Sequence, residues 1–513
     1  MNTAPDAPAD TNGFGHGLLQ NLVDMERTRE HYWRRFPQTS PTKLRWRANA
    51  VRHALHVTVG DRVLELGAGG GLWTGYLERR LPDSSVTAAV FNADLAEVAR
   101  ADGCSEVRHV TALADLEPES FDVVVGTAIL SHDRYRENLD WIHALLRPRG
   151  GMLFFEANYW NPQVFMKAQS VRLARWSGNS DCQIALRKPM LSVALRRQRF
   201  VDPVVVPYDI LHPRTPAPLV PALQSAAFVA EHLPAVREAC GTLFIYARRG
   251  DSPLRRPRPD LTEHERFVDA VSVVVPCHNE EENAPRLVAA LTQSYSGYLR
   301  EIILVNDNSQ DETAAVVDAM AAQDGRVRVI HRSGPPGVGR ALREGYAATS
   351  GTWILSLDCD FEMLVPELRD MFDAVADGHD GAIGSRFSHE SVLLNYPAGK
   401  LLGNRAFHVL VRCVTRHPVR DVSNNLKLYR GDLLRGMSIT QDGFAANAEI
   451  GLKPILAGAD IAEVPMAWIN READMGASNF KVLRVAPGYA AALLRMMREH
   501  GRPGRRAPFP GPH

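Results

Sequence analysis

The 513-residue chain lacks several features that would place it in a special class at once. It has no run of the roughly 18 to 20 apolar residues that a membrane-spanning helix needs. The best candidate, residues 485–494, is short and contains Pro487 and Gly488. The first residues also lack the basic and then apolar plan of a signal peptide. We therefore expect a cytoplasmic protein, either free or peripheral at the inner face of a membrane.

Paired cysteines and an excess of charge are also absent. The six cysteines include no C-x-x-C pair, which argues against a disulfide framework or a structural zinc and fits a reducing compartment. The 59 basic side chains balance 59 acidic ones, so bulk electrostatics does not indicate a nucleic-acid partner. No internal repeat is visible.

Length and composition predict two domains. Residues 249–267 include Pro253, Pro257 and Pro259 among charged residues and indicate a linker. On both sides of it, short apolar runs alternate with longer amphipathic stretches, a pattern typical of parallel sheets covered by helices. The predicted organisation is a disordered lead over residues 1–20, a domain over 21–248, the linker, a domain over 268–500 and a basic, proline-rich tail over 501–513.

Acidic loops follow three apolar runs of the second domain. The first loop contains Pro276, Asn279 and Glu280, the second Asn306, Asp307, Ser309, Asp311 and Thr313, and the third Asp358, Asp360 and Glu362. Nucleotides bind in α/β sheets at the carboxyl ends of the strands. Two carboxylates two residues apart at the end of a buried strand suit Mg²⁺ or Mn²⁺ carrying a diphosphate.

These loops resemble the family 2 glycosyltransferases, whose corresponding motifs are P-x-x-N-E, D-D-x-S-x-D-x-T and D-x-D. Asn306 replaces the first Asp of the second motif. The resemblance covers roughly residues 268–500 and is strongest to the polyprenol-phosphate glycosyltransferases of the dolichol-phosphate mannose synthase type. It implies a GT-A fold and metal-dependent direct transfer of a sugar from a UDP- or GDP-linked donor to a polyprenyl phosphate.

The resemblance also assigns roles to individual residues. It implies donor binding by Pro276, Glu280, Asp307, Asp358 and Arg340, and metal binding by Asp358, Asp360 and Glu362, the last of which stands where the family usually has Gln. It implies that Arg386, Arg405 and Arg471 bind the acceptor phosphate, with Asp360, Arg386 and Arg471 as the catalytic set.

The acceptor could instead be a hydroxyl group, which would need a general base. Asp442 and Glu449 are the candidates for that base. A lipid phosphate is already an anion and needs cations rather than a base, and arginine suits phosphate geometry. We therefore favour the lipid phosphate.

The first domain contains a buried-strand pattern that runs into a glycine-rich turn at Gly67, Gly69 and Gly71. Such a turn lets a ligand approach backbone amides at a helix start. Residues 43–248 resemble the class I S-adenosylmethionine-dependent methyltransferases, and the resemblance implies that Glu65 and the three glycines bind that cofactor.

Two departures from this second family concern the cofactor. Val90 stands where an acidic residue should hold the ribose hydroxyls, and Ala112 where an Asp should lie near the adenine. Each missing hydrogen bond costs on the order of 1–3 kcal/mol. A scaffold without cofactor and an active methyltransferase both remain open.

Three hypotheses for the whole chain follow. The first is a glycosyltransferase, the second a bifunctional glycosyltransferase and methyltransferase, and the third a non-catalytic binding module, against which the intact Asp358 and Asp360 argue. Two apolar stretches with arginines, residues 401–414 and 482–497, could lie at an anionic membrane surface or face a core.

Overall fold

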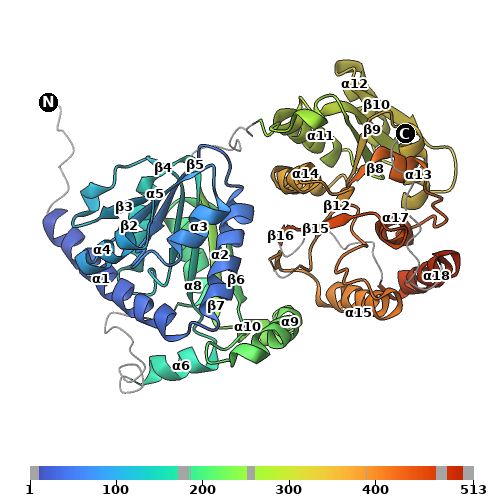
Figure 1. The fold of residues 1–513 in the computed structure, drawn as a ribbon. Coiled ribbons are helices and arrows are strands. Elements are labelled where there is room, and N and C mark those ends of the chain that lie inside the picture. Colours follow the sequence, from blue (N-terminus) through green and yellow to red (C-terminus); the bar gives the residue numbers. More distant parts are fainter. Residues whose placement is uncertain are drawn as a thin grey trace, which may run out of the picture. The chain divides into compact units, whose positions relative to one another are not determined.

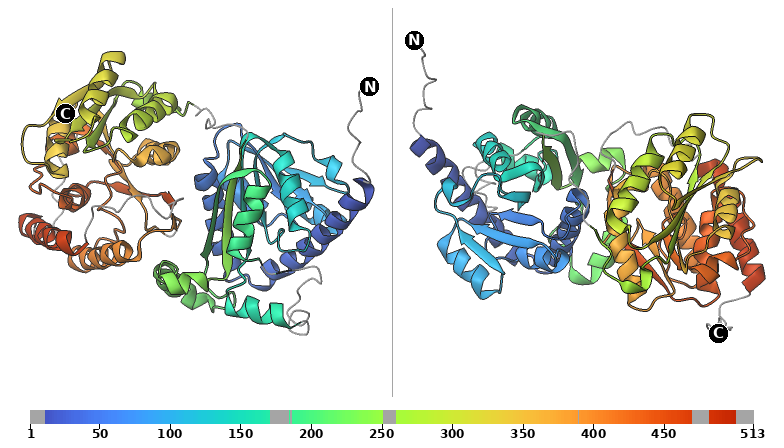
Figure 2. Two further views of the ribbon diagram at one scale, coloured as in Figure 1. Left: turned by 180° about the vertical axis from the view of Figure 1, so that it is seen from behind. Right: turned by 90° about the horizontal axis from the view of Figure 1, so that it is seen from above.

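The computed structural model describes residues 11–170, 184, 186–250, 260–388, 390–469 and 482–500. The chain divides into two compact units, which are described separately (Figure 1). Unit 1 comprises residues 1–256 with the short segments 394–398 and 469–473, and unit 2 comprises the remainder. Each unit is an α/β fold with helices on both faces of its sheet, as predicted (Figure 2).

The larger helices of unit 1 are α1 (Thr11–Arg35), α2 (Ser40–Leu55), α3 (Thr74–Arg80), α4 (Ala93–Ala101), α5 (Tyr135–Leu145), α6 (Pro162–Gln169), α8 (Lys188–Arg197), α9 (Val220–Ala230) and α10 (Pro234–Glu238). Its strands are β1 (Arg62–Leu66), β2 (Ser85–Val90), β3 (Glu106–His109), β4 (Phe121–Thr127), β5 (Leu146–Ala157), β6 (Phe200–Tyr208) and β7 (Thr242–Arg249).

The sheet of unit 1 has the strand order β3-β2-β1-β4-β5-β7-β6. Neighbouring strands are parallel from β3 to β5, whereas β7 runs antiparallel to both β5 and β6. β1 is almost entirely buried, as expected of a parallel strand covered on both faces. The glycine-rich turn follows β1 and therefore lies at the carboxyl edge of the sheet.

The helices of unit 2 are α11 (Asn283–Tyr295), α12 (Thr313–Gln323), α13 (Val338–Ala347), α14 (Leu368–Ala376), α15 (Ala398–Thr415), α16 (Gly431–Arg435), α17 (Ala445–Leu456) and α18 (Val482–His500), with a 3-10 helix, η4, at Phe361–Glu367. Its strands are β8 (Val271–Cys277), β9 (Leu299–Asn306), β10 (Val327–His331), β11 (Trp353–Ser356), β12 (Gly381–Ser385), β13 (Val392–Leu394), β14 (Lys427–Arg430), β15 (Ile461–Pro465) and β16 (Ala467–Ile469).

The main sheet of unit 2 has the order β10-β9-β8-β11-β14-β12-β15, and β13 pairs with β16 in a small second sheet. β10, β9, β8 and β11 are parallel, and β14 runs antiparallel to both of its neighbours. The loops after β8, β9 and β11 therefore leave the same edge of the sheet, and these are the three acidic loops of the sequence.

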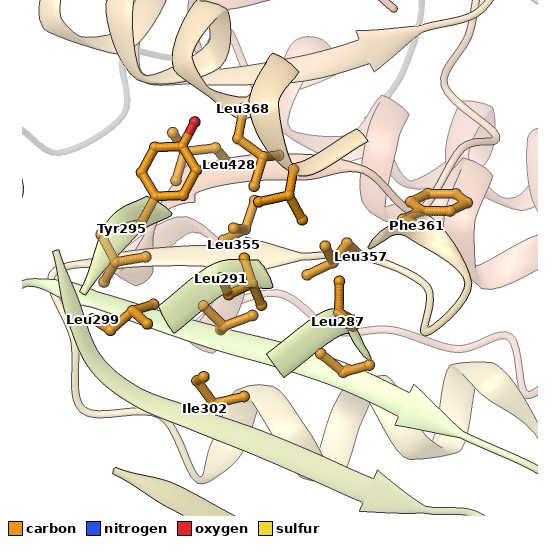
Figure 3. Packing of buried hydrophobic residues seen from close by; sticks show 14 of the residues in the cluster. Leu287, Leu291, Tyr295, Leu299, Ile302, Leu355, Leu357, Phe361, Leu368 and Leu428 are labelled. Carbon is orange, nitrogen blue, oxygen red and sulfur yellow. The ribbon is translucent and has the colours of Figure 1, made fainter. Parts of the chain in front are cut away.

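One face of this sheet is packed by an apolar stripe of α11. Leu287, Leu291 and Tyr295 recur at helical spacing and are almost fully buried. Figure 3 shows them beside Leu355 of β11 and Ile302 of β9. This packing fixes the starting points of the acidic loops.

The predicted disordered lead is corrected where the structure describes it. α1 already begins at Thr11, and Leu18 is completely buried. Composition alone had hidden a helical stripe, because Leu18, Leu22 and Met25 continue one buried face across the predicted boundary. Among the helices of the described residues, none is both long and apolar enough to cross a bilayer.

Candidate active site

Asp358 and Asp360 lie in the loop that follows β11. Asp358 is half-buried, and its Oδ1 accepts a hydrogen bond of 2.8 Å from Asn425 Nδ2. Desolvation raises the pKa of Asp358. Desolvation, then the carboxylates of Asp358 and Glu280, raises the pKa of Asp360 to about 7, although part of that side chain reaches solvent. Carboxylates that disfavour each other's charge in this way are suited to a shared cation.

Glu280 belongs to the same acidic group. Its pKa is raised by desolvation and by Asp358 and Asp311, while Asn283 Nδ2 donates to its Oε2 at 2.7 Å. Among the described residues, no three His, Cys, Asp or Glu side chains gather closely enough to hold a metal alone. The two aspartates fit a metal only if other oxygens, such as those of a diphosphate, complete its coordination.

Two other acidic residues of the loops have different surroundings. Glu362 is half-buried at the start of η4. Asp311 Oδ1 accepts hydrogen bonds from the amide and hydroxyl of Thr313, at 3.1 and 2.5 Å. Asp311 therefore stabilises the first residue of α12. This is a structural role, in contrast to binding a ligand.

Asp307, just after β9, is held firmly by two partners. Arg332 donates to its Oδ1, and the backbone amide of Gly337 donates to its Oδ2 at 2.6 Å. Arg332 is itself fixed by Glu344 through an ion pair of 2.8 Å. The neighbouring Asn306 accepts from the amide of Ser309 at 3.2 Å and shapes the turn. Sequence reasoning missed Arg332, which no motif marks.

Arg386 and Arg405 come together, although they lie on different elements. Arg386 forms a paired contact with Asp421, with distances of 2.7 Å from Nε to Oδ2 and 2.9 Å from Nη2 to Oδ1. Both guanidinium groups lie over the ring of Phe387, at 5.2 Å for Arg386 and 5.8 Å for Arg405. Desolvation and the cations Arg412 and Arg420 lower the pKa of Arg405.

Two lysines that sequence reasoning missed belong to this neighbourhood. Lys400, in the first turn of α15, interacts electrostatically with Asp360 and Arg386. Lys427 on β14 is completely buried, and burial lowers its pKa to about 7, against the opposing charges of Asp421 and Asp358. Only the tertiary structure brings these cations to the D-x-D loop, since each lies in an unremarkable stretch of sequence.

The two candidate general bases are both engaged. Asp442 pairs with Arg343 at 2.5 Å and with Arg340 at 2.8 Å, and these bonds lower its pKa. Glu449 is 1% exposed, pairs with Lys453 at 2.6 Å and accepts from the amides of residues 440 and 441. An arginine-paired or buried, fully bonded carboxylate is a poor proton acceptor for a substrate.

The remaining predicted residues of unit 2 are placed as follows. Pro276 is half-buried at the end of β8, and Arg340 lies in the first turn of α13, paired with Asp442. Arg471 lies outside the described residues.

The cofactor crevice predicted for unit 1 is filled by the chain itself. Glu65 is completely buried and accepts from Thr74 Oγ1 at 2.7 Å, and burial raises its pKa to about 8. Val90 ends β2 and offers no side-chain acceptor. The amides of Gly69 and Gly70 already donate to glutamates of α1. These residues do not fit a bound S-adenosylmethionine.

The match with known families follows the two units. Residues 272–437 match the family model of glycosyl transferase family 2, and residues 63–150 match that of a methyltransferase domain. Unit 2 therefore carries a family 2 glycosyltransferase domain of GT-A type and unit 1 a methyltransferase-like domain, which confirms both predicted resemblances. The predicted enzyme class, a glycosyltransferase, is confirmed as well.

Individual relatives are similar to part of the chain. The polyprenol monophosphomannose synthase of Mycolicibacterium smegmatis is 28% identical over 224 residues, or 41% of this chain and 82% of that protein. The dolichol-phosphate mannosyltransferase of Pyrococcus furiosus is 26% identical over 201 residues, or 39% of this chain and 56% of its own length. A structure of glucosyl-3-phosphoglycerate synthase from Mycobacterium tuberculosis covers 49% of this chain and 86% of its own, with 18% identity and a TM-score of 0.37.

Proposed function

We propose that this chain transfers a hexose from a nucleotide sugar to the phosphate of a polyprenyl-type lipid. The observation that carries the proposal is the state of the candidate bases, Asp442 and Glu449, which are tied up in ion pairs. A hydroxyl acceptor must lose its proton to a base, whereas a lipid phosphate attacks as an anion. The names of the two curated relatives, a polyprenol monophosphomannose synthase and a dolichol-phosphate mannosyltransferase, support this acceptor class.

The acceptor phosphate would be bound by the cations beside Phe387. Arg386 is largely balanced by Asp421, but Arg405 has cationic neighbours and a lowered pKa, which an incoming anion would relieve. The charge of Lys400 interacts with Arg386 of this group and with Asp360. Arg386 and Arg405 can orient phosphate oxygens through paired N–H donors. Arg471 remains a proposed member of this set.

The donor would lie at the carboxyl edge of the sheet. Pro276, Glu280 and Asp307 are proposed for its base and ribose, with Arg332 holding Asp307 in place. Arg340 is proposed for the diphosphate, in exchange for its present ion pair with Asp442. Mg²⁺ or Mn²⁺ held by Asp358 and Asp360, with Glu362 as a further proposed ligand, would supply positive charge at the departing diphosphate.

The reaction then needs no proton transfer by the protein. A phosphate oxygen of the lipid forms the new bond to the anomeric carbon, and the bond from that carbon to the nucleoside diphosphate breaks. We propose a single direct displacement, because none of the described carboxylates near the aspartate pair is assigned to a covalent step. The protein's work is positioning and charge compensation.

Contact with a membrane surface fits this acceptor. The inner face of α15 is buried at Leu401 and Val411, while Leu402, Val409 and Leu410 on its outer face are 45–48% exposed. Along the helix, Arg405 lies between Leu402 and Val409, and Arg412 follows Leu410. The combination is typical of a helix that lies at an anionic interface, so we propose peripheral membrane contact through α15.

A donor screen tests the proposal. The full chain is incubated with UDP- and GDP-linked hexoses and Mn²⁺, with and without polyprenyl phosphate in detergent, and release of nucleoside diphosphate is measured. We expect release that depends on polyprenyl phosphate with at least one donor. Release that is unchanged by the lipid phosphate with every donor would refute the assigned acceptor.

A further inference from the structure

The glycine-rich turn of unit 1 is built for close approach to its backbone. Gly67, Gly69 and Gly71 have φ angles of +66°, +59° and +78°, a region in which side chains other than glycine are strained. A turn of this kind presents backbone N–H groups that bind an anionic or hydroxylated ligand. The question is which group takes these donors in this chain.

The groups that take them are two carboxylates of α1. Glu26 Oε1 accepts from the amide of Gly69 at 2.9 Å, and its Oε2 accepts from the amides of Phe91 and Asn92 at 3.0 and 2.9 Å. Glu30 Oε2 accepts from the amide of Gly70 at 3.2 Å. Glu26 therefore bridges the turn after β1 and the end of β2, directly beyond Val90.

α1 is seated in the crevice by apolar packing as well. Leu18, Leu22 and Met25 are at most 1% exposed and share a hydrophobic cluster with Leu66 and Phe91. Arg29, on the same face of the helix, donates to the carbonyl of Thr127 at the end of β4, at 3.4 Å. The face that α1 turns inward is thus apolar at one end and charged where it meets the backbone donors.

The close approach that glycine permits is used by α1. A Cβ added at Gly69 would lie 2.7 Å from Arg29 Nη2 and 2.7 Å from Glu30 Oε2. At Gly70, an added Cβ would lie 2.8 Å from Glu30 Oε1. Side chains of the chain itself, not empty space, stand against the turn.

The β4 side of the crevice is closed in the same manner. Glu156 is 1% exposed and accepts from the amides of Ile129 and Leu130, each at 2.8 Å, and from the hydroxyl of Ser131 at 2.6 Å. Glutamates of unit 1 therefore accept from backbone amides in each of the turns that follow β1, β2 and β4.

We infer that α1 is a built-in substitute for the cofactor of this fold: Glu26 and Glu30 occupy the backbone donors of the crevice, and unit 1 folds without S-adenosylmethionine and does not take it. Binding of the cofactor would require Leu18, Leu22 and Met25 to leave the core and the amides to exchange partners. Val90 could not then supply the ribose acceptor. At Gly69 and Gly70, the absence of a side chain leaves room for Arg29 and Glu30 of α1.

Two measurements on the full chain test this inference. The first is calorimetric titration of the wild-type protein with S-adenosylmethionine and S-adenosylhomocysteine. We expect no binding heat and no shift in the unfolding temperature of unit 1. A micromolar dissociation constant for either compound would overturn the inference, and this arm does not depend on the folding of any variant.

The second measurement is hydrogen exchange in Glu26→Ala and Glu26→Gln. In Glu26→Ala, we expect exchange at the amides of Gly69, Phe91 and Asn92 to speed up by about tenfold or more, because buried donors lose their acceptor. In Glu26→Gln, we expect the same at the amides that the single remaining carbonyl oxygen does not reach. Asp24→Asn is the matched control, since Asp24 lies on the same helix and its carboxylate bonds to Gln20. Unchanged exchange in both Glu26 variants would contradict the inference, whereas general unfolding of unit 1 in Glu26→Ala alone, with local acceleration in Glu26→Gln, would agree with it.

Discussion

At the scale of single residues, the D-x-D pair carries the most specific prediction. Desolvation raises the pKa of both Asp358 and Asp360, and Asp358 raises that of Asp360 further. Among the described residues, no group of three His, Cys, Asp or Glu side chains is close enough to hold a metal alone. Asp358→Asn or Asp360→Asn keeps the shape and removes the charge that a metal needs. Turnover should fall on the order of a hundredfold or more, with the fold intact.

Steady-state rates of nucleoside diphosphate release, measured with saturating Mn²⁺, check this prediction. The exposed Asp377→Asn in the same unit is the control and should leave the rate unchanged. Full activity of both D-x-D variants in the presence of a chelator would exclude the metal-dependent mechanism.

Arg405 carries a second prediction, about the acceptor. Arg405→Ala should raise the KM for polyprenyl phosphate by roughly ten- to a hundredfold, since a charge-assisted hydrogen bond to the phosphate is lost. The KM for the nucleotide sugar should change little. Arg405→Lys should recover only part of the loss, because lysine keeps the charge without the paired donors.

Kinetics in which each substrate is varied separately provide the measurement for Arg405. Arg286→Ala is a suitable control, since Arg286 is an exposed arginine of α11 in the same unit. If the Arg405 variants weaken binding of the donor and not of the lipid, the acceptor site has been assigned to the wrong place.

Residues that form motifs could be predicted from the sequence, whereas residues that support them could not. Asp307 and Asp358 stand in recognisable phrases at strand ends. Arg332, just after β10, and Lys427, on β14, act on these carboxylates, and their distance in sequence hides the contact. Asp442 was a candidate base in the sequence. Its pairing with two arginines could be seen only in the folded structure.

At the scale of elements, His408 links α15 to the backbone at Val422, close to Arg386 and Arg405. It is 1% exposed, its Nε2 accepts from the amide of Val422 at 2.9 Å, and burial lowers its pKa from 6.5 to about 4, with Asp421, Arg386 and Arg405 as charged neighbours. The unfolded chain binds a proton more readily than the folded one. The neutral His408 side chain therefore leaves the stability of unit 2 at its full value above pH 6.5. This contribution is lost as the pH falls toward about 4 and the folded protein must take up a proton at a buried site.

The loss should amount to about 3 kcal/mol across that pH range. Chemical unfolding of unit 2 in the full chain, measured at several pH values, shows whether His408→Gln removes this part of the pH dependence. The difference between wild type and variant is the relevant quantity, because His132 of unit 1 also has a pKa lowered to about 4. An identical pH dependence in both proteins would contradict the assignment.

The outer stripe of α15 provides a prediction about membranes. Replacing Leu402, Val409 and Leu410 by Ser should weaken co-sedimentation with anionic vesicles about tenfold or more, because apolar area no longer enters the interface. Stability should change little, since these side chains are exposed. Val268→Ser, at a 56% exposed position elsewhere in unit 2, is the control. Equal vesicle binding by the triple variant and the control would remove α15 from the proposed contact.

Helices and strands could be predicted well where the pattern of apolar residues was clear. The runs that become β8 and β9 are continuous and apolar, as parallel buried strands require. The first part of α1 was assigned to the lead, because the polar composition of residues 1–16 hid the buried face that begins at Leu18. A row of charged side chains in a sequence is normally predicted to face solvent. Here Glu26 and Glu30 are buried because backbone amides donate to them.

At the scale of the whole molecule, one chain contains two α/β units whose buried carboxylates have different partners. In unit 1, Glu26, Glu30 and Glu156 accept hydrogen bonds from backbone amides that follow β1, β2 and β4, and we infer that this fold is complete without a ligand. In unit 2, Asp358 and Asp360 have raised pKa values, which a bound cation would lower. Arg405 is desolvated, and a bound anion would compensate its charge. The transfer chemistry is therefore assigned to unit 2 alone.

The most direct measurement compares two acceptors that differ in one group. The full chain is given a labelled nucleotide sugar and vesicles that contain either a polyprenyl phosphate or the corresponding free polyprenol. We predict labelled lipid from the phosphate and none from the alcohol, because the two candidate bases for a hydroxyl, Asp442 and Glu449, are both held in ion pairs. Equal or faster labelling of the alcohol, or of a soluble sugar alcohol, would contradict the proposed function.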